Sequence, residues 1–138
     1  MRWLMLMGAL MLGACASDLE PSAAELRARW DAQNVYPQNY KSDLLAFLRT
    51  YLNNPEKVRS ATLSPPILKK LGPGDRYVAC VRYDARRTDG KYAGMKTGAA
   101  SYVAGKLDRF FDTPPQQVEE MCKGAAYAPF PELERLTR

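Results

Sequence analysis

The feature that most constrains the fold is a strict alternation of side chains over residues 76–86. In an extended strand, successive side chains point to opposite faces of a sheet. Every second residue from Tyr77 to Ala85 belongs to an apolar set on one face. The other face carries Val78 and Cys80 together with charged residues. The segment therefore predicts a half-buried central strand, with its charges towards the ends or the solvent. The apolar set consists of Tyr77, Ala79, Val81, Tyr83 and Ala85.

Asp89-Gly90 follows this strand and predicts the turn of a β-hairpin. The pair tolerates the positive φ angles that a two-residue turn requires. Such a turn places Arg87 opposite Tyr92 and begins a returning strand over residues 91–97. The glycines within that returning strand indicate a bulge or a close approach of another group.

The remaining segments complete an α+β pattern. Helices are predicted over residues 22–33 and 42–53 and between Thr113 and Gly124, from capping residues and apolar periodicity. Further strands are expected over residues 57–63, 99–105 and 107–111. Residues 64–74, rich in Pro and Gly, predict a shaped loop. We expect one α+β domain over residues 22–138, with a small antiparallel sheet of three or four strands and helices packed on one face.

The first fifteen residues predict export. Arg2 precedes a short apolar run that ends in small residues, which is the pattern of a secretory signal peptide. The run from Trp3 to Ala14 is shorter than the roughly 20 apolar residues that span a bilayer. Its ending, Leu12-Gly13-Ala14-Cys15, resembles the lipobox of bacterial lipoproteins.

This resemblance implies that residues 1–14 are removed, that Cys15 carries acyl chains, and that residues 15–21 form a lipidated tether. The membrane is then a partner through the lipid anchor. The residue after the cysteine is Ala16 rather than Asp, which favours the outer membrane, with the domain facing the periplasm. The alternatives are an ordinary signal peptide with a chance cysteine, or an uncleaved buried helix.

Two cysteines remain once Cys15 is assigned to lipid. Disulfides persist in the oxidising compartments that exported chains enter. We therefore expect Cys80 and Cys122 to be bonded to each other, with two buried free thiols as the alternative. Neither lies in a C-x-x-C pair, so no metal site is expected.

The chain contains no histidine. This excludes Ser-His-Asp and Cys-His catalytic sites and removes the commonest metal ligand. No glycine-rich phosphate-binding motif is present, and no cofactor is expected. The chain has 20 Lys and Arg against 15 Asp and Glu. This mild excess suits an anionic surface and falls short of what nucleic-acid binding requires.

Basic and aromatic residues gather around the predicted hairpin. Arg offers forked donors and Tyr offers a stacking face, so these residues form a candidate surface for an anionic glycan or a lipid headgroup. The alternative is a solvated strand whose charges discourage pairing with other chains. The candidate residues are Arg76, Arg82, Tyr83, Arg86, Arg87 and Tyr92.

Carboxylates occur in three pairs. General acid–base catalysis needs two carboxyl groups in one cleft. Carboxylates that are merely solvated on the surface are the alternative, and they have no catalytic role. No catalytic residue is assigned from them. The pairs are Glu119 with Glu120, Asp84 with Asp89, and Asp108 with Asp112.

The sequence thus favours a membrane-anchored envelope lipoprotein that is a non-catalytic binding or scaffolding module. Its expected partner is an envelope protein or an anionic glycan, and not a nucleic acid. Two alternatives stay open. One is a small enzyme that acts on the cell wall or on polysaccharide through Asp and Glu. The other is an inhibitor-type lipoprotein, which a protruding loop over residues 64–74 would favour.

Overall fold

A computed structural model describes residues 19–137 of the chain. The signal segment, Cys15 and the tether up to residue 18 lie outside the described residues. The elements in chain order are α1 (Ala23–Ala32), α2 (Tyr40–Tyr51), β1 (Asn54–Leu63), β2 (Ile67–Leu71), β3 (Gly74–Arg86), β4 (Tyr92–Val103), β5 (Lys106–Phe111), α3 (Pro115–Met121), β6 (Ala128–Pro129) and α4 (Pro131–Glu134).

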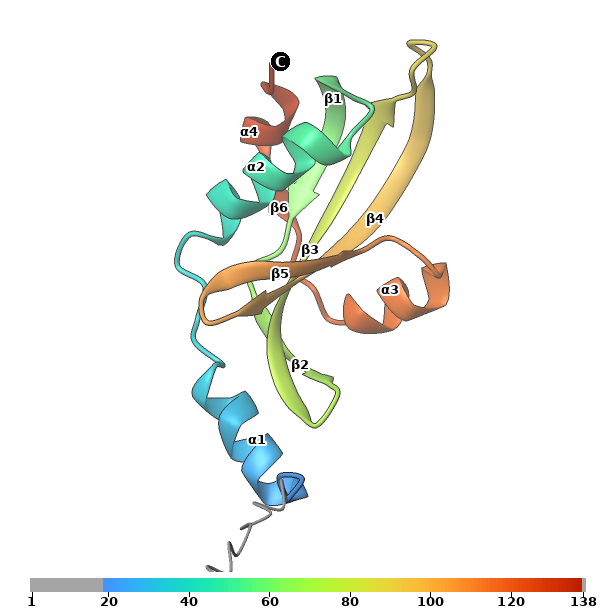
Figure 1. The fold of residues 1–138 in the computed structure, drawn as a ribbon. Helices are drawn as coiled ribbons and strands as arrows, with labels where there is room; N and C mark the ends of the chain where they lie inside the picture. Colours follow the sequence, from blue (N-terminus) through green and yellow to red (C-terminus); the bar gives the residue numbers. More distant parts are fainter. Residues whose placement is uncertain (1–18, 138) are drawn as a thin grey trace, which may run out of the picture.

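The strands form one antiparallel sheet in the order β5-β4-β3-β1-β6, with β2 also paired to β3 (Figure 1). The predicted α+β class is confirmed. The expected three or four strands are wrong, because the sheet that residues 19–137 form has six. β3 lies in the centre, as its alternation predicts.

The predicted loop over residues 64–74 is also wrong, because it contains β2. Ile67 to Leu71 pair with β3 in an unbroken register from Ile67↔Val78 to Leu71↔Gly74. Pro65 and Pro66 precede this strand, and Gly72 and Pro73 form the turn after it, so no proline interrupts the ladder. The segment is a hairpin arm that projects below the sheet (Figure 1).

Helices cover both faces of the sheet, so the expectation of helices on one face is wrong. α2 and α4 pack on the face of Tyr83 and Tyr102, here called the core face. α3 packs on the face of Val78 and Cys80, here called the disulfide face, and lies on the other side of the sheet in Figure 1. Val78 and Cys80 are apolar side chains on this second face, and α3 shields them from solvent.

The predicted disulfide between Cys80 and Cys122 is confirmed. It joins β3 to the residue after α3, with the two Cα atoms 5.8 Å apart. The side chains of Val118 and Met121 are buried around it. The bond therefore ties α3 to the centre of the sheet.

α2 is the predicted amphipathic helix. Leu44 and Leu48 are fully buried against the sheet. The helix begins at Tyr40, and Asn39 takes the N-cap position. The predicted helix over residues 42–53 takes Ser42 as its N-cap, and this is wrong, because the Ser42 hydroxyl donates to the Asn39 carbonyl from inside the first turn (3.0 Å).

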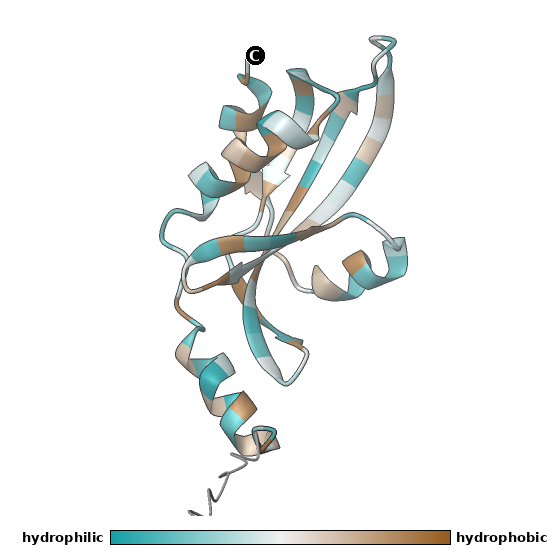
Figure 2. Cartoon of the chain, viewed as in Figure 1, coloured by the Kyte–Doolittle hydropathy of each residue, from teal (hydrophilic) through white to brown (hydrophobic). Residues whose placement is uncertain are grey.

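α1 has the predicted capping box. The Glu25 amide donates to Ser22 Oγ (3.2 Å), and the Ser22 amide donates to Glu25 Oε2 (2.7 Å). The helix buries none of its residues. Figure 2 shows hydrophilic and hydrophobic colours interspersed along it. Its attachment to the sheet depends on a few side chains rather than on an apolar face.

The turn between β3 and β4 is longer than predicted. The Arg87 amide donates to the Lys91 carbonyl (2.8 Å), so Arg86 rather than Arg87 pairs with Tyr92. The register shifts again next to Gly94, whose φ is +95°. This bulge offsets the extra turn residue, and the rest of the ladder keeps the register that a two-residue turn implies.

Candidate binding groove

A groove of about 940 Å³ lies on the disulfide face. It runs between α3 and the free part of β4, which is residues 92–98, the part that β5 does not pair with. β4 supplies one side and α3 supplies the other, while Arg82 of β3 and the segment after α3 complete it. The lining residues are Arg82, Met95, Lys96, Thr97, Asp112, Thr113, Pro115, Gln116, Val118, Glu119, Glu120, Cys122, Lys123, Gly124, Ala125 and Tyr127.

The part of β4 beside the groove is an unpaired edge. β5 pairs with β4 only from Phe111, opposite Ala99, back to Lys106. The chain then turns away at Pro114 and Pro115, and proline cannot donate a ladder hydrogen bond. Within residues 19–137, no strand pairs with residues 92–98 on the side away from β3.

The main-chain groups of Met95 and Thr97 point outward from this edge. The Cys80 amide donates to Ser64 Oγ (2.9 Å), and its carbonyl accepts from the Ser64 amide (2.8 Å), so both point away from β4. Main-chain directions alternate along a strand, and Tyr83 therefore faces its partner Lys96. It follows that Met95 and Thr97, on either side of Lys96, offer their N–H and C=O groups to the solvent.

Arg82 and Tyr127 form the floor of the groove. The Arg82 guanidinium lies 3.9 Å from the centre of the Tyr127 ring, a cation–π contact. The Tyr127 hydroxyl is buried and makes no hydrogen bond of normal geometry to a described residue. Burial raises the pKa of Tyr127, and the nearby Arg82 partly opposes this. The floor is therefore apolar with one exposed cation.

The two sides of the groove carry opposite charges. Arg82 and Lys96 stand on the sheet side, and Glu119 and Glu120 stand on α3. Lys123 neutralises part of the helix side, since its ammonium lies 3.5 Å from Glu120.

A second, smaller hollow of about 270 Å³ lies against the same edge. Its lining includes Tyr51, Tyr83 and Arg86, and it shares Lys96 and Asp112 with the groove. The shared residues show that the two hollows meet at the free part of β4. Both faces beside this edge are therefore hollowed.

Asp112 is held by α2. The Tyr51 hydroxyl donates to the Asp112 carboxylate. This hydrogen bond, with burial and the carboxylate charge, raises the pKa of Tyr51 to about 12. The pair fixes the segment that leads from β5 to α3.

The predicted basic-aromatic residues do not form one surface. Tyr83 lies on the core face and is buried. Arg76 is buried at the other end of β3, against Trp30. Hydrophobic alternation alone does not reveal which arginines a distant helix covers.

The other predicted residues lie at three places: in the turn, beside β1 and on the disulfide face. Arg87 pairs with Asp89 in the turn (3.3 Å). Arg86 donates to the Glu56 carbonyl (3.4 Å). Of the six, Arg82 and Tyr92 reach the open part of the disulfide face.

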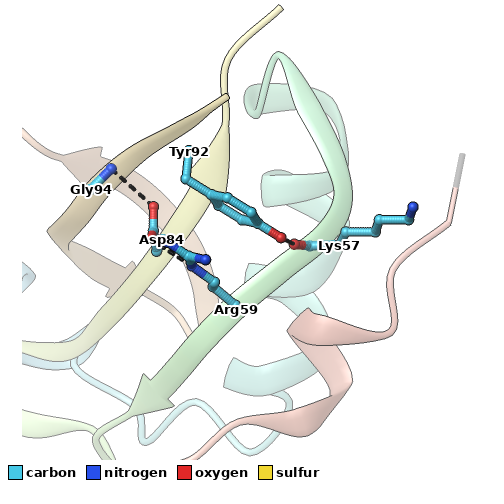
Figure 3. A network of polar contacts seen from close by, with 5 residues as sticks. All are labelled: Lys57, Arg59, Asp84, Tyr92 and Gly94. Carbon is cyan, nitrogen blue, oxygen red and sulfur yellow. Dashed lines mark hydrogen bonds and ion pairs between the residues drawn. The ribbon is translucent and has the colours of Figure 1, made fainter. Parts of the chain in front are cut away.

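Tyr92 belongs to a network centred on Asp84 (Figure 3). Asp84 Oδ2 accepts from Arg59 Nε (2.9 Å), and Asp84 Oδ1 accepts from the Gly94 amide (2.9 Å). The Arg59 guanidinium lies 3.7 Å from the centre of the Tyr92 ring. The Tyr92 hydroxyl donates to the Lys57 carbonyl (2.8 Å). The network joins β1, β3 and β4. Asp84 and Tyr92 therefore have structural roles in holding these strands together.

Sequence reasoning missed Arg59 because β1 is irregular. Lys57 and Ser60 have φ values of +57° and +55°, and the register of β1 shifts on both sides of Arg59. No alternation pattern could assign this side chain to a face. Sequence reasoning also missed Met95, whose role depends on where β5 ends.

Three carboxylates line the groove: the predicted pair Glu119 and Glu120, together with Asp112. The other two predicted pairs are not brought together there, since Asp84, Asp89 and Asp108 do not line it. Among the described residues, no group of three or more acidic or cysteine side chains is arranged to hold a metal ion. The described helices include none with the length and apolar character needed to cross a membrane.

Comparison with known proteins gives no relative at a significant level: the chain matches no family model, no curated protein and no solved structure.

Proposed function

We propose that this chain is a lipid-anchored, non-catalytic binding module of the bacterial cell envelope, and that the groove between β4 and α3 is its binding site. The signal-like segment and the lipobox resemblance at Cys15 support the anchor and the outer-membrane location. The unpaired β4 edge beside a groove of about 940 Å³ carries the binding part of the proposal. A volume of this size is typical of ligand sites.

The groove is suited to binding because its sides are held in place before a ligand arrives. The disulfide joins α3 to β3, and the Tyr51–Asp112 hydrogen bond holds the segment before α3. Preorganised sites lose less conformational entropy on binding.

The charges favour a protein over an anionic glycan as the partner. The lining has three cations and three carboxylates, and the carboxylates gather towards α3. A polyanion would meet repulsion along that side. A protein segment with mixed side chains meets both signs favourably.

The anchor is tested by labelling the expressing bacterium with radioactive palmitate. We expect label in the wild-type chain and none in Cys15→Ala, while Cys122→Ala keeps it. Equal labelling of the wild type and Cys15→Ala would contradict the lipid anchor.

The site is tested by a matched pair of substitutions. Met95 is 57% exposed in the groove, and Leu68 is 50% exposed on the hairpin arm. We expect Met95→Glu, and not Leu68→Glu, to abolish co-purification with a defined envelope protein. Binding to purified cell-wall sacculi that Met95→Glu leaves unchanged would instead favour a glycan ligand elsewhere.

An enzyme acting on polysaccharide is the second candidate, favoured by one observation: Asp112, Glu119 and Glu120 line the same groove. Hydrolysis through two carboxylates would require such a grouping. Release of soluble fragments from sacculi, lost in Glu119→Gln, would support it. No release under conditions where the chain is folded would count against it.

A further inference from the structure

We infer that the groove binds an extended peptide of a partner protein, which adds as a strand to the free edge of β4. This inference rests on the proposed function and names the class of its ligand. The peptide would lie in line with β5, in the place that β5 would occupy if it continued beyond Phe111.

The first argument is the outward direction of the main chain at Met95 and Thr97. A strand edge of this kind is a template for another strand, and strand addition is a common mode of peptide recognition. The groups are accessible, since both hollows meet at this edge.

The second argument is the space on both faces of the edge. Side chains of an added strand would alternate between the groove and the smaller hollow. Residues opposite Met95 and Thr97 would project into the groove, and the residue between them would project beside Lys96.

The lining residues define the chemistry of the peptide. Met95 and the Tyr127 ring favour apolar side chains on the groove side. Lys96 favours an acidic side chain at the position between them. We therefore expect an apolar-acidic-apolar run in extended form.

A second copy of this chain fits the edge poorly. Antiparallel self-pairing centred on Lys96 would set two lysines directly opposite each other, and like charges in that position are unfavourable. Lysine on a free edge is a known protection against such pairing. An acidic partner peptide converts the same lysine into an attraction.

The experiment uses the full chain, labelled with ¹⁵N and purified in detergent, and a capped pentapeptide of sequence Thr-Val-Glu-Val-Thr. Amide exchange of Met95 and Thr97 is followed by NMR, with Lys96 and Gly98 as internal controls because their amides face β3. Without peptide, we expect fast exchange at the first pair and slow exchange at the second. Millimolar peptide should protect Met95 and Thr97.

Three altered peptides separate main-chain pairing from side-chain contact. N-methylation of both valines removes the donors that face β4 and should weaken binding by about tenfold or more. N-methylation of the glutamate leaves those donors intact and should change binding little. Replacing the glutamate by lysine should also weaken binding, since it meets Lys96.

Absence of protection at Met95 and Thr97 at millimolar peptide would overturn the inference, as would equal binding of the valine-methylated peptide. The proposed function fails by a different result, namely co-purification of the envelope partner that Met95→Glu leaves intact. If Met95→Glu abolishes co-purification of the partner but the wild-type chain does not bind the peptide, the groove remains the binding site and strand addition is ruled out.

Discussion

The guanidinium of Arg76 lies 3.5 Å from the centre of the Trp30 ring and joins α1 to the β2–β3 hairpin. Arg76 Nη1 also donates to the Trp30 carbonyl (2.7 Å), and Trp30 Nε1 donates to the Asp75 carbonyl (2.6 Å). Burial lowers the pKa of Arg76, and the nearby carboxylates of Asp108 and Asp31 oppose this. The pair holds a helix that buries no residue of its own.

Trp30→Ala should therefore release α1 without unfolding the sheet. We expect hydrogen exchange to quicken at the α1 amides and to stay unchanged in β3 and β4. Leu26→Ala, on the same helix, is the control and should leave α1 protected, because Leu26 is exposed. Persistent protection of α1 in Trp30→Ala would show that other contacts hold the helix.

Removing the disulfide should destabilise the fold. Cys80 and Cys122 are 42 residues apart, and closing such a loop stabilises by about 4 kcal/mol in the chain-entropy account. Urea unfolding should show a loss of this order when the wild type is reduced. The Cys80→Ala/Cys122→Ala variant should unfold identically with and without reductant. A reduced wild type as stable as the oxidised form would contradict this account.

Gly98→Ala should be destabilising by about 1–3 kcal/mol. A Cβ at Gly98 would overlap the ring of Phe110, which packs on Phe47 with ring centres 5.1 Å apart. Chemical denaturation measures the loss. In a Phe110→Ala background the same change should cost much less, since the ring is gone. Equal costs in the two backgrounds would rule out the steric explanation.

Ionisation of Tyr51 should make the fold sensitive to alkaline pH. Its pKa is raised from 10.0 to about 12 in the folded chain, chiefly by the hydrogen bond to Asp112. The stabilisation is therefore complete below pH 10 and is lost as pH rises through about 12.

The ultraviolet absorbance of tyrosinate can follow this titration. We expect Asp112→Asn to shift one tyrosine transition to lower pH, and Tyr51→Phe to remove that transition. Burial also raises the pKa of Tyr83 and Tyr102, so these two should ionise at a higher pH than exposed tyrosines. An unchanged titration in Asp112→Asn would contradict the assigned cause.

Local signals were read correctly from the sequence. The alternation over residues 76–86 predicts β3 and its two faces, because side-chain direction follows from strand geometry alone. The capping box at Ser22 and Glu25 involves neighbours three residues apart. The sequence also predicts the Cys80–Cys122 bond, because these are the two cysteines outside the signal-like segment.

The errors lie where a distant segment decides the outcome. Arg76 looked like a surface cation, yet Trp30, 46 residues earlier, covers it. The turn after β3 was predicted one residue too short, because the bulge at Gly94 depends on Asp84 accepting its amide. The candidate groove depends on where β5 stops and α3 docks.

The sequence by itself determined the α+β class, the central strand with its two faces, and the disulfide partners, since each follows from local periodicity or from elimination among few residues. Only the tertiary structure decided which helix covers which face, which arginines are buried, and where β4 is left unpaired. These depend on packing between segments far apart in the chain, and neither side-chain alternation nor composition encodes such distances.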